Sequence, residues 1–189
     1  MKPAISESQA AAMVMNAIFR QSDMRWPELS GPLFKLLSDQ GLQVNNPEYV
    51  KFHLSIAALS VNMRALFDLF SRSRATQIFD THLEILKQFF PDKVQYKAVE
   101  NTIGKYIEAY NEGIYNIRNP LQDVAMYMYY KIGLVNTEQT VVDENFYAPE
   151  PAIRDYLANA LGLFTGKWEH ILERFEPGGN TDSPEGHPS

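Results

Sequence analysis

Histidine is the side chain best suited to acid–base catalysis and metal binding near neutral pH, and this chain carries four histidines and no cysteine. His53 and His82 lie on apolar stripes with helical spacing, whereas His187 lies in a polar stretch rich in glycine and proline. A metal site in a helical bundle combines histidine with carboxylates three or four residues away. The residues three before and four after His53 and His82 are all apolar. We therefore predict no metal site, and we expect core imidazoles that bond to backbone carbonyls.

A second interpretation of the same histidines is a small-molecule site, in a binding protein or an enzyme, with an aromatic-lined cavity between helices. If the helices that carry His53 and His82 pack antiparallel, the two imidazoles can approach each other. Tyr106 and Tyr110, from the helix that follows, are then the expected lining tyrosines. A cavity of this kind needs polar groups that converge on a ligand. The sequence does not identify such groups, and this alternative stays open.

Motifs of other reaction classes are absent from the sequence. Without cysteine the chain has no disulfides, thiolate metal sites or cysteine nucleophiles. It also has neither a G-x-S-x-G turn nor a glycine-rich phosphate loop. The segment SRSRATQ at 71–77 offers two arginines beside a helix start, which suits an anion but also fits a helix break with a serine cap. We predict no catalytic residue, no metal and no cofactor.

Charge and hydropathy argue against two further classes of protein. The formal charge is −6, the isoelectric point is near 5.2 and the basic residues are scattered, so nucleic-acid binding is disfavoured. The longest apolar-rich stretch, 52–70, contains His53, Asn62, Arg64 and Asp68, which are costly in lipid. The N-terminus lacks the apolar centre of a signal peptide. We therefore expect a soluble, cytoplasmic protein without a membrane span.

Apolar residues recur with a period of about 3.6 along most of the chain, which predicts an all-α fold. We expect a single-domain helical bundle of about six or seven helices, with no significant sheet. Pro27, Gly31 and Pro32 predict a connector after the first helix, and residues 137–149 predict a long loop. Residues 177–189 predict a disordered tail behind a helical domain over 1–176. The expected helices cover 6–20, 33–38, 46–71, 76–90, 94–117, 120–134 and 151–175.

The helix expected over 120–134, PLQDVAMYMYYKIGL, has more apolar surface than one neighbouring helix can cover. One interpretation is a central helix whose tyrosine hydroxyls reach water or backbone groups between its neighbours. A second is a surface for a partner protein or for a second copy of the chain, because Tyr and Met are favoured in interface cores. A ligand pocket is the third. Under the second interpretation, the interaction surface consists of Met126, Tyr127, Tyr130 and Leu134.

Four strings along residues 51–134 resemble a known family: FHLSIAALSVNMRAL, IFDTHLEILKQF, YIEAYNEGI and LQDVAMYMYY. In the order of its helices and in a few local pairs, this region is similar to the ubiquinol–cytochrome c chaperone family, whose members assist assembly of the respiratory bc1 complex. The resemblance implies a non-enzymatic assembly factor that acts through protein surfaces. The residue patterns favour the same class, so we expect a helical protein–protein interaction or assembly factor. Self-association as a homodimer is one form of this expectation.

Overall fold

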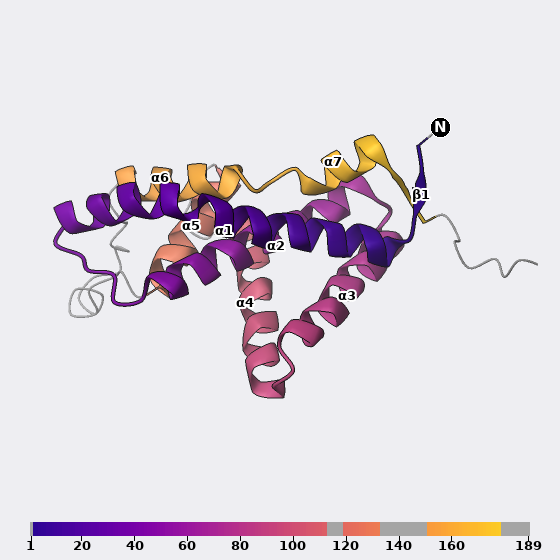
Figure 1. The fold of residues 1–189 in the computed structure, drawn as a ribbon, viewed down its shortest axis with the longest axis horizontal. Helices are drawn as coiled ribbons and strands as arrows, with labels where there is room; N and C mark the ends of the chain where they lie inside the picture. The colour runs from indigo at the N-terminus through magenta and orange to yellow at the C-terminus, as the bar shows by residue number, and fades with distance from the viewer. Residues whose placement is uncertain (1, 113–118, 133–150, 179–189) are drawn as a thin grey trace, which may run out of the picture.

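The computed structural model describes residues 2–112, 119–132 and 151–178, which form an all-α fold (Figure 1). The expected fold class is confirmed, since the only strands in this part of the chain are two residues long. The loop expected over 137–149 lies outside the described residues. The elements are β1 (Ala4–Ile5), α1 (Glu7–Asp39), α2 (Pro47–Leu69), α3 (Arg72–Phe89), α4 (Lys93–Glu112), α5 (Pro120–Lys131), α6 (Pro151–Gly162), α7 (Lys167–Arg174) and β2 (Glu176–Pro177).

Helix α2 is the centre of the bundle and contacts each of the other six helices. Every residue from His53 to Met63 is buried, whichever side of the helix it occupies. The helix begins where the sequence predicts, because the Asn46 side chain accepts a hydrogen bond from a first-turn backbone N–H. Arg64 and Asp68, four residues apart on this helix, form an ion pair at 2.8 Å. A helix apolar on all sides therefore takes the central position that its sequence indicates.

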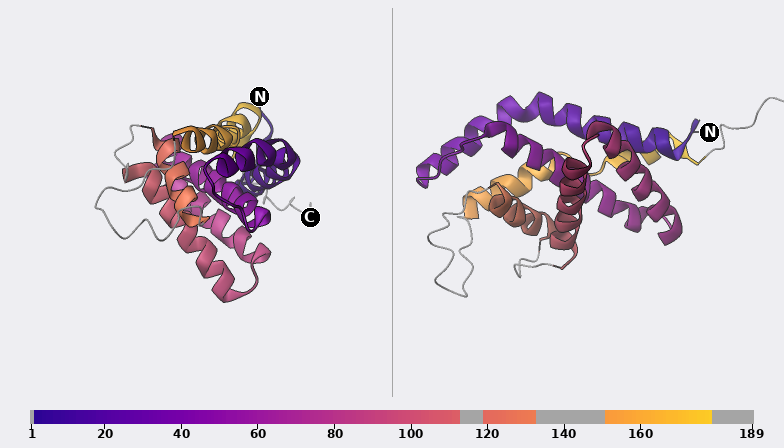
Figure 2. Two further views of the ribbon diagram at one scale, coloured as in Figure 1. Left: turned by 90° about the vertical axis from the view of Figure 1, so that its left-hand side faces the viewer. Right: turned by 90° about the horizontal axis from the view of Figure 1, so that it is seen from below.

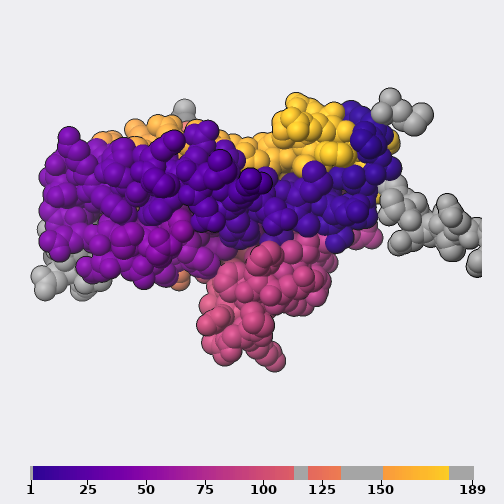
Figure 3. All heavy atoms as spheres, viewed as in Figure 1, coloured from indigo at the N-terminus to yellow at the C-terminus, as the bar shows by residue number. Residues whose placement is uncertain are grey.

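The outline of the molecule is an elongated body from which one helical hairpin projects. Helices α1 and α2 run along the body beside α5, α6 and α7 (Figure 1). Helices α3 and α4 form the hairpin, whose far end stands clear of the body in the space-filling view (Figure 3). No helix of the described ranges is long and apolar enough to cross a lipid bilayer.

The connector expected around Pro27 and Pro32 is wrong, because α1 continues through both prolines as one helix of 33 residues. The right-hand view of Figure 2 shows that this helix is bent, as proline in a helix interior predicts. Trp26 and Leu33 lie on the buried stripe on either side of the prolines. Their burial against the core stabilises the helical path more than the two missing N–H donors destabilise it.

The single last helix expected over 151–175 is also wrong, because the chain breaks between α6 and α7. Helix α6 ends at Gly162, and Gly166, the N-cap residue of α7, adopts a left-handed conformation with φ of 71°. The side-chain amide of Asn62, from the middle of α2, bridges the break. Its Nδ2 donates to the Phe164 carbonyl at 2.8 Å, and its Oδ1 accepts from the Lys167 N–H at 3.0 Å. A fully buried side chain of α2 thus supplies hydrogen bonds to both sides of the turn.

The two ends of the described chain meet in a short parallel β-pair, in which Ala4 lies opposite Glu176. The Arg74 side chain, from α3, donates hydrogen bonds to both ends of the described chain: to the Glu7 carboxylate at 2.8 Å and to the Pro177 carbonyl. The Gly178 N–H donates to the Ile5 carbonyl at 2.9 Å. Residues 177 and 178, at the start of the expected tail, belong to this described backbone. Residues 179–189 lie outside the described residues.

Candidate functional site

His53 and Tyr106 form a buried polar pair where the first half of α2 packs on α4. The His53 Nδ1 and the Tyr106 hydroxyl lie 2.9 Å apart and share a hydrogen bond. His53 is 2 % exposed and Tyr106 is completely buried. The sequence correctly placed His53 in the core, but its partner is a tyrosine hydroxyl rather than the expected backbone carbonyl.

Burial keeps both members of this pair neutral at pH 7. Burial, with a smaller contribution from the positive charge of Lys131, lowers the pKa of His53 to about 4. Burial also raises the pKa of Tyr106 well above its usual value, with smaller contributions from Tyr127 and Tyr49. A general base at neutral pH needs a pKa near 7. The pair therefore suits hydrogen bonding within the core better than proton transfer.

The pair is the inner part of a row of aromatic rings that crosses five helices, which we call the aromatic band. Neighbouring rings in it have centroids 4.5 to 6.3 Å apart. Phe89 and Phe90, which are adjacent in sequence, join the part on α1 to the part on α2. Its members are Phe19 from α1, Tyr49, Phe52 and His53 from α2, Phe89 and Phe90 from the end of α3, Tyr106 from α4 and Tyr127 from α5.

The outer rings of the aromatic band reach the surface. Phe89 is 57 % exposed and Tyr49 is 40 % exposed, while Phe19, Phe52 and Tyr127 are half-buried. Phe89 contacts the half-buried ring of Phe19, so these two rings form a local apolar patch, unlike a phenylalanine that stands alone. The band is thus a surface feature with a buried polar pair beneath it.

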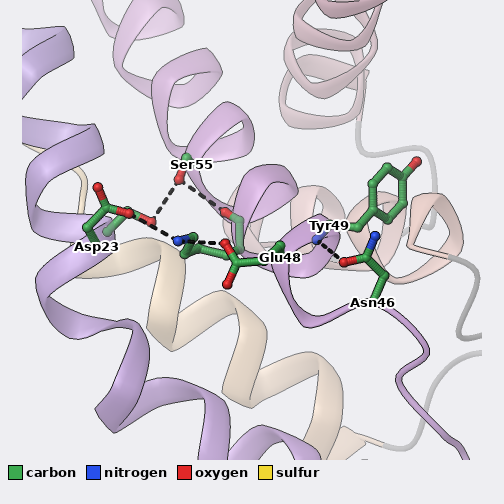
Figure 4. Close-up of polar contacts among 7 residues, drawn as sticks. Asp23, Asn46, Glu48, Tyr49 and Ser55 are labelled. Carbon is green, nitrogen blue, oxygen red and sulfur yellow. Dashed lines mark hydrogen bonds and ion pairs between the residues drawn. The ribbon is translucent and has the colours of Figure 1, made fainter.

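Charged residues next to the band hold the start of α2 in place. The Lys51 ammonium pairs with two carboxylates, Asp23 of α1 at 3.2 Å and Glu48 at 2.8 Å, both of which are labelled in Figure 4. The Tyr49 ring points away from these ion pairs. Because Lys51 is engaged with acidic groups of its own chain, the exposed ring of Tyr49 is the feature at this end of α2 that is left for another molecule.

The second histidine of the expected pocket lies elsewhere. His82 is completely buried on α3, and its Nδ1 donates to the Ile78 carbonyl at 2.9 Å, as expected for a core histidine. Its ring faces Trp168 of α7 at 5.6 Å. None of the hydrogen bonds or ring contacts among the described residues joins it to His53. The hydrogen bonds and ring contacts thus join His82 to Trp168 of α7 and His53 to Tyr106 of α4.

Tyr110, the remaining residue of the expected pocket, contacts Arg64 in the second half of α2. The guanidinium of Arg64 lies over its ring, 5.8 Å from the centroid. Tyr110 lines an open cleft of about 260 Å³ beside the α6–α7 break, together with Asn62 and Glu169. Of the four expected pocket residues, His53 and Tyr106 are the pair that shares a hydrogen bond and a ring contact among the described residues.

Most of α5 packs inside the bundle, against α4 and α6. Met126 is 1 % exposed, so it is not part of an exposed interaction surface in this structure. Tyr127 and Tyr130 are half-buried, and Leu134 lies outside the described residues. Tyr127 alone among the four expected surface residues belongs to the aromatic band.

Sequence reasoning missed the most exposed ring of the band, Phe89. The sequence feature that could have indicated its exposure is the aromatic pair Phe89 and Phe90, which lies directly before Pro91 at the end of a helix. A single apolar stripe can bury only one of two consecutive residues on a helix, since they point about 100° apart. Phe90 packs on Phe52, and Phe89 is left at the surface.

No group of three or more histidine, aspartate or glutamate side chains within the described ranges is arranged to hold a metal ion. Comparisons of the chain with protein-family models, with curated proteins and with solved structures found no match, so the resemblance of residues 51–134 to the ubiquinol–cytochrome c chaperone family stays a prediction.

Proposed function

We propose that this protein is a non-enzymatic interaction or assembly factor, which binds another protein through the aromatic band. The observation that carries the proposal is the exposure of two rings of the band that pack on other rings, Phe89 on Phe19 and Tyr49 on His53. Aromatic residues are enriched in protein–protein interfaces and supply much of the binding energy there.

The exposed area of Phe89 is large enough to matter for binding. A phenylalanine can bury roughly 200 Å², and 57 % of its surface is exposed, which leaves about 110 Å² for a partner. At about 25 cal/mol per Å² this area is worth about 3 kcal/mol if it is fully covered. Binding costs reduce this gain, but one such ring is comparable to a strong interface residue.

The His53–Tyr106 pair supports the same role. A buried hydrogen bond that links α2 to α4 fixes the position of the rings above it, because both of its partners are buried. A rigid aromatic surface loses less conformational entropy when it binds than a flexible one. The pair thus acts in positioning the surface rather than in chemistry.

The test places a photo-crosslinking amino acid, p-benzoylphenylalanine, at one position at a time in cells that produce the protein. We expect a crosslinked product of defined mass from position 89 and none from position 24. Met24 is 69 % exposed and is not part of the aromatic band, which makes it a matched control. Replacing Tyr49 by serine in the same chain should weaken the product from position 89 at least tenfold without changing helicity.

The outcomes separate the competing functions. A product of twice the chain mass identifies self-association, and a heavier or lighter product identifies a different partner. Equal products from positions 24 and 89 would contradict the proposal. A native mass spectrum with a bound small molecule that disappears in His53→Gln would instead favour the binding-protein or enzyme alternative.

A further inference from the structure

His82 and Trp168 present two buried polar atoms that have no hydrogen-bond partner in the structure. The atoms are the His82 Nε2 and the Trp168 Nε1. Both side chains are completely buried, and their ring centroids are 5.6 Å apart with the planes inclined at 64°. Buried polar groups are nearly always hydrogen-bonded, to protein or to water. Two such exceptions in direct ring contact therefore require an explanation.

The hydrogen-bonding character of each atom follows from its surroundings. The Ile78 carbonyl can only accept, so the His82 Nδ1 bonded to it carries the hydrogen. Burial lowers the pKa of His82 to about 4, so the imidazole is neutral at pH 7 and its Nε2 has a free lone pair. The Trp168 Nε1–H can only donate. One atom is an acceptor and the other a donor, and the pair is complementary.

We infer that a single buried water molecule bridges the two rings, accepting from the Trp168 Nε1–H and donating to the His82 Nε2. The ligand class follows from two requirements. The bridging molecule must both accept and donate, and it must fit beside two side chains with no exposed surface. Water meets both requirements, and buried waters typically satisfy otherwise unpaired polar groups in this way.

The bridge would link α7 to α3 near the place where the chain ends meet. Phe70 packs on the other contact surface of Trp168, with ring centroids 5.8 Å apart at 88°. Trp168 is therefore fixed by one apolar contact and one polar bridge. The bridge would also fix which edge of the Trp168 indole faces α3, and with it the orientation in which α7 packs, because an apolar contact alone does not specify that edge.

The experiment uses the full chain labelled with ¹⁵N, in which Trp26 and Trp168 give the only two indole signals. The indole proton of Trp168 should show a rotating-frame Overhauser cross-peak to water, with the sign of a long-lived bound molecule rather than of proton exchange. Assignment comes from the variant Trp26→Phe, or from Trp168→Phe if the first does not fold. The cross-peak should be lost in His82→Leu and kept in His53→Leu, whose side chain does not contact Trp168.

Two results would overturn the inference. A scalar coupling between the Trp168 Nε1 and the His82 Nε2 would show a direct hydrogen bond with no water between them. A Trp168 indole signal without a water cross-peak in the wild-type chain would show that the donor stays unpaired. If His82→Leu does not fold, a crystal structure of the wild-type chain decides by the presence or absence of density between the two rings.

Discussion

Replacing Asn62 by leucine tests whether α2 holds the break between α6 and α7. Leucine has the same branched arrangement of side-chain heavy atoms but removes the donor to the Phe164 carbonyl and the acceptor for the Lys167 N–H. The third hydrogen bond of Asn62, to the Ala58 carbonyl, lies within its own helix. The first two bonds therefore carry the expected effect.

The size of the effect follows from the two backbone groups left unpaired. Each buried group without a partner costs about 1–3 kcal/mol. Phe164 is completely buried, so water does not replace its lost donor, whereas the Lys167 N–H is only part-buried. We expect a loss of about 2–4 kcal/mol in the free energy of unfolding, a large share of the about 5–15 kcal/mol typical of a folded domain.

The assay is urea unfolding followed by circular dichroism and by tryptophan fluorescence, which reports on Trp26 in α1 and Trp168 in α7. A loss of 2–4 kcal/mol should lower the urea midpoint by about 1 M or more. Hydrogen exchange should also rise selectively over 163–174, because this segment loses its attachment to α2.

Ser60→Ala is the matched control. Ser60 is completely buried on the same helix, but its hydroxyl donates at 2.7 Å to the Ile56 carbonyl of its own helix. Its replacement should cost less than about 1 kcal/mol. The reasoning is refuted if Asn62→Leu costs no more than Ser60→Ala, or if exchange over 163–174 does not change.

Three further predictions concern acid, the chain ends and the bend in α1. Burial lowers the pKa of His82 from 6.5 to about 4, so the unfolded chain binds a proton before the folded chain does as the pH falls. This difference should cost up to about 3 kcal/mol of folding stability between pH 6.5 and 4. Urea titrations of His82→Leu should show a smaller loss of stability over this range, and a pH profile equal to that of the wild type would contradict the prediction. Gly178→Ala places a Cβ 2.7 Å from the Arg74 guanidinium, at a backbone φ of +96° that alanine rarely adopts. Hydrogen exchange at the β1–β2 pair should therefore rise. Equal exchange in the variant and the wild type would show that the pair does not depend on this glycine. Tyr156→Phe removes the hydroxyl that donates to the Leu29 carbonyl at 2.8 Å, close to the prolines of α1; thermal unfolding should show a loss of about 1 kcal/mol, and an unchanged melting temperature would mean that water replaces the hydroxyl.

Some features of the fold could be predicted because their causes are local. The capping box of Ser6 and Gln9 is present as predicted, since its two hydrogen bonds join residues only three apart. Asn119 likewise begins α5 by accepting from a backbone N–H two residues later. The central position of α2 could be predicted because its apolar residues occupy all sides of the helix.

The candidate site was only partly predictable for a different reason. Periodicity shows that a side chain is buried, but not which element covers it. His53 and His82 have the same apolar sequence surroundings, yet one contacts Tyr106 and the other contacts Trp168. Phe89 shows that periodicity also fails to predict exposure, because an apolar residue near a helical stripe can be buried by a neighbouring helix or left at the surface.

The sequence by itself determined an all-α protein, the start of most helices and the absence of known catalytic motifs, because helical periodicity and caps depend on residues at most four apart. Only the tertiary structure decided that α1 passes through two prolines, that the last helix breaks at Gly166 and that the chain ends meet beside Arg74. In each case a contact between residues far apart in the chain outweighs a local preference. The same holds for the aromatic band, whose rings come from five helices and acquire a common surface only when those helices pack.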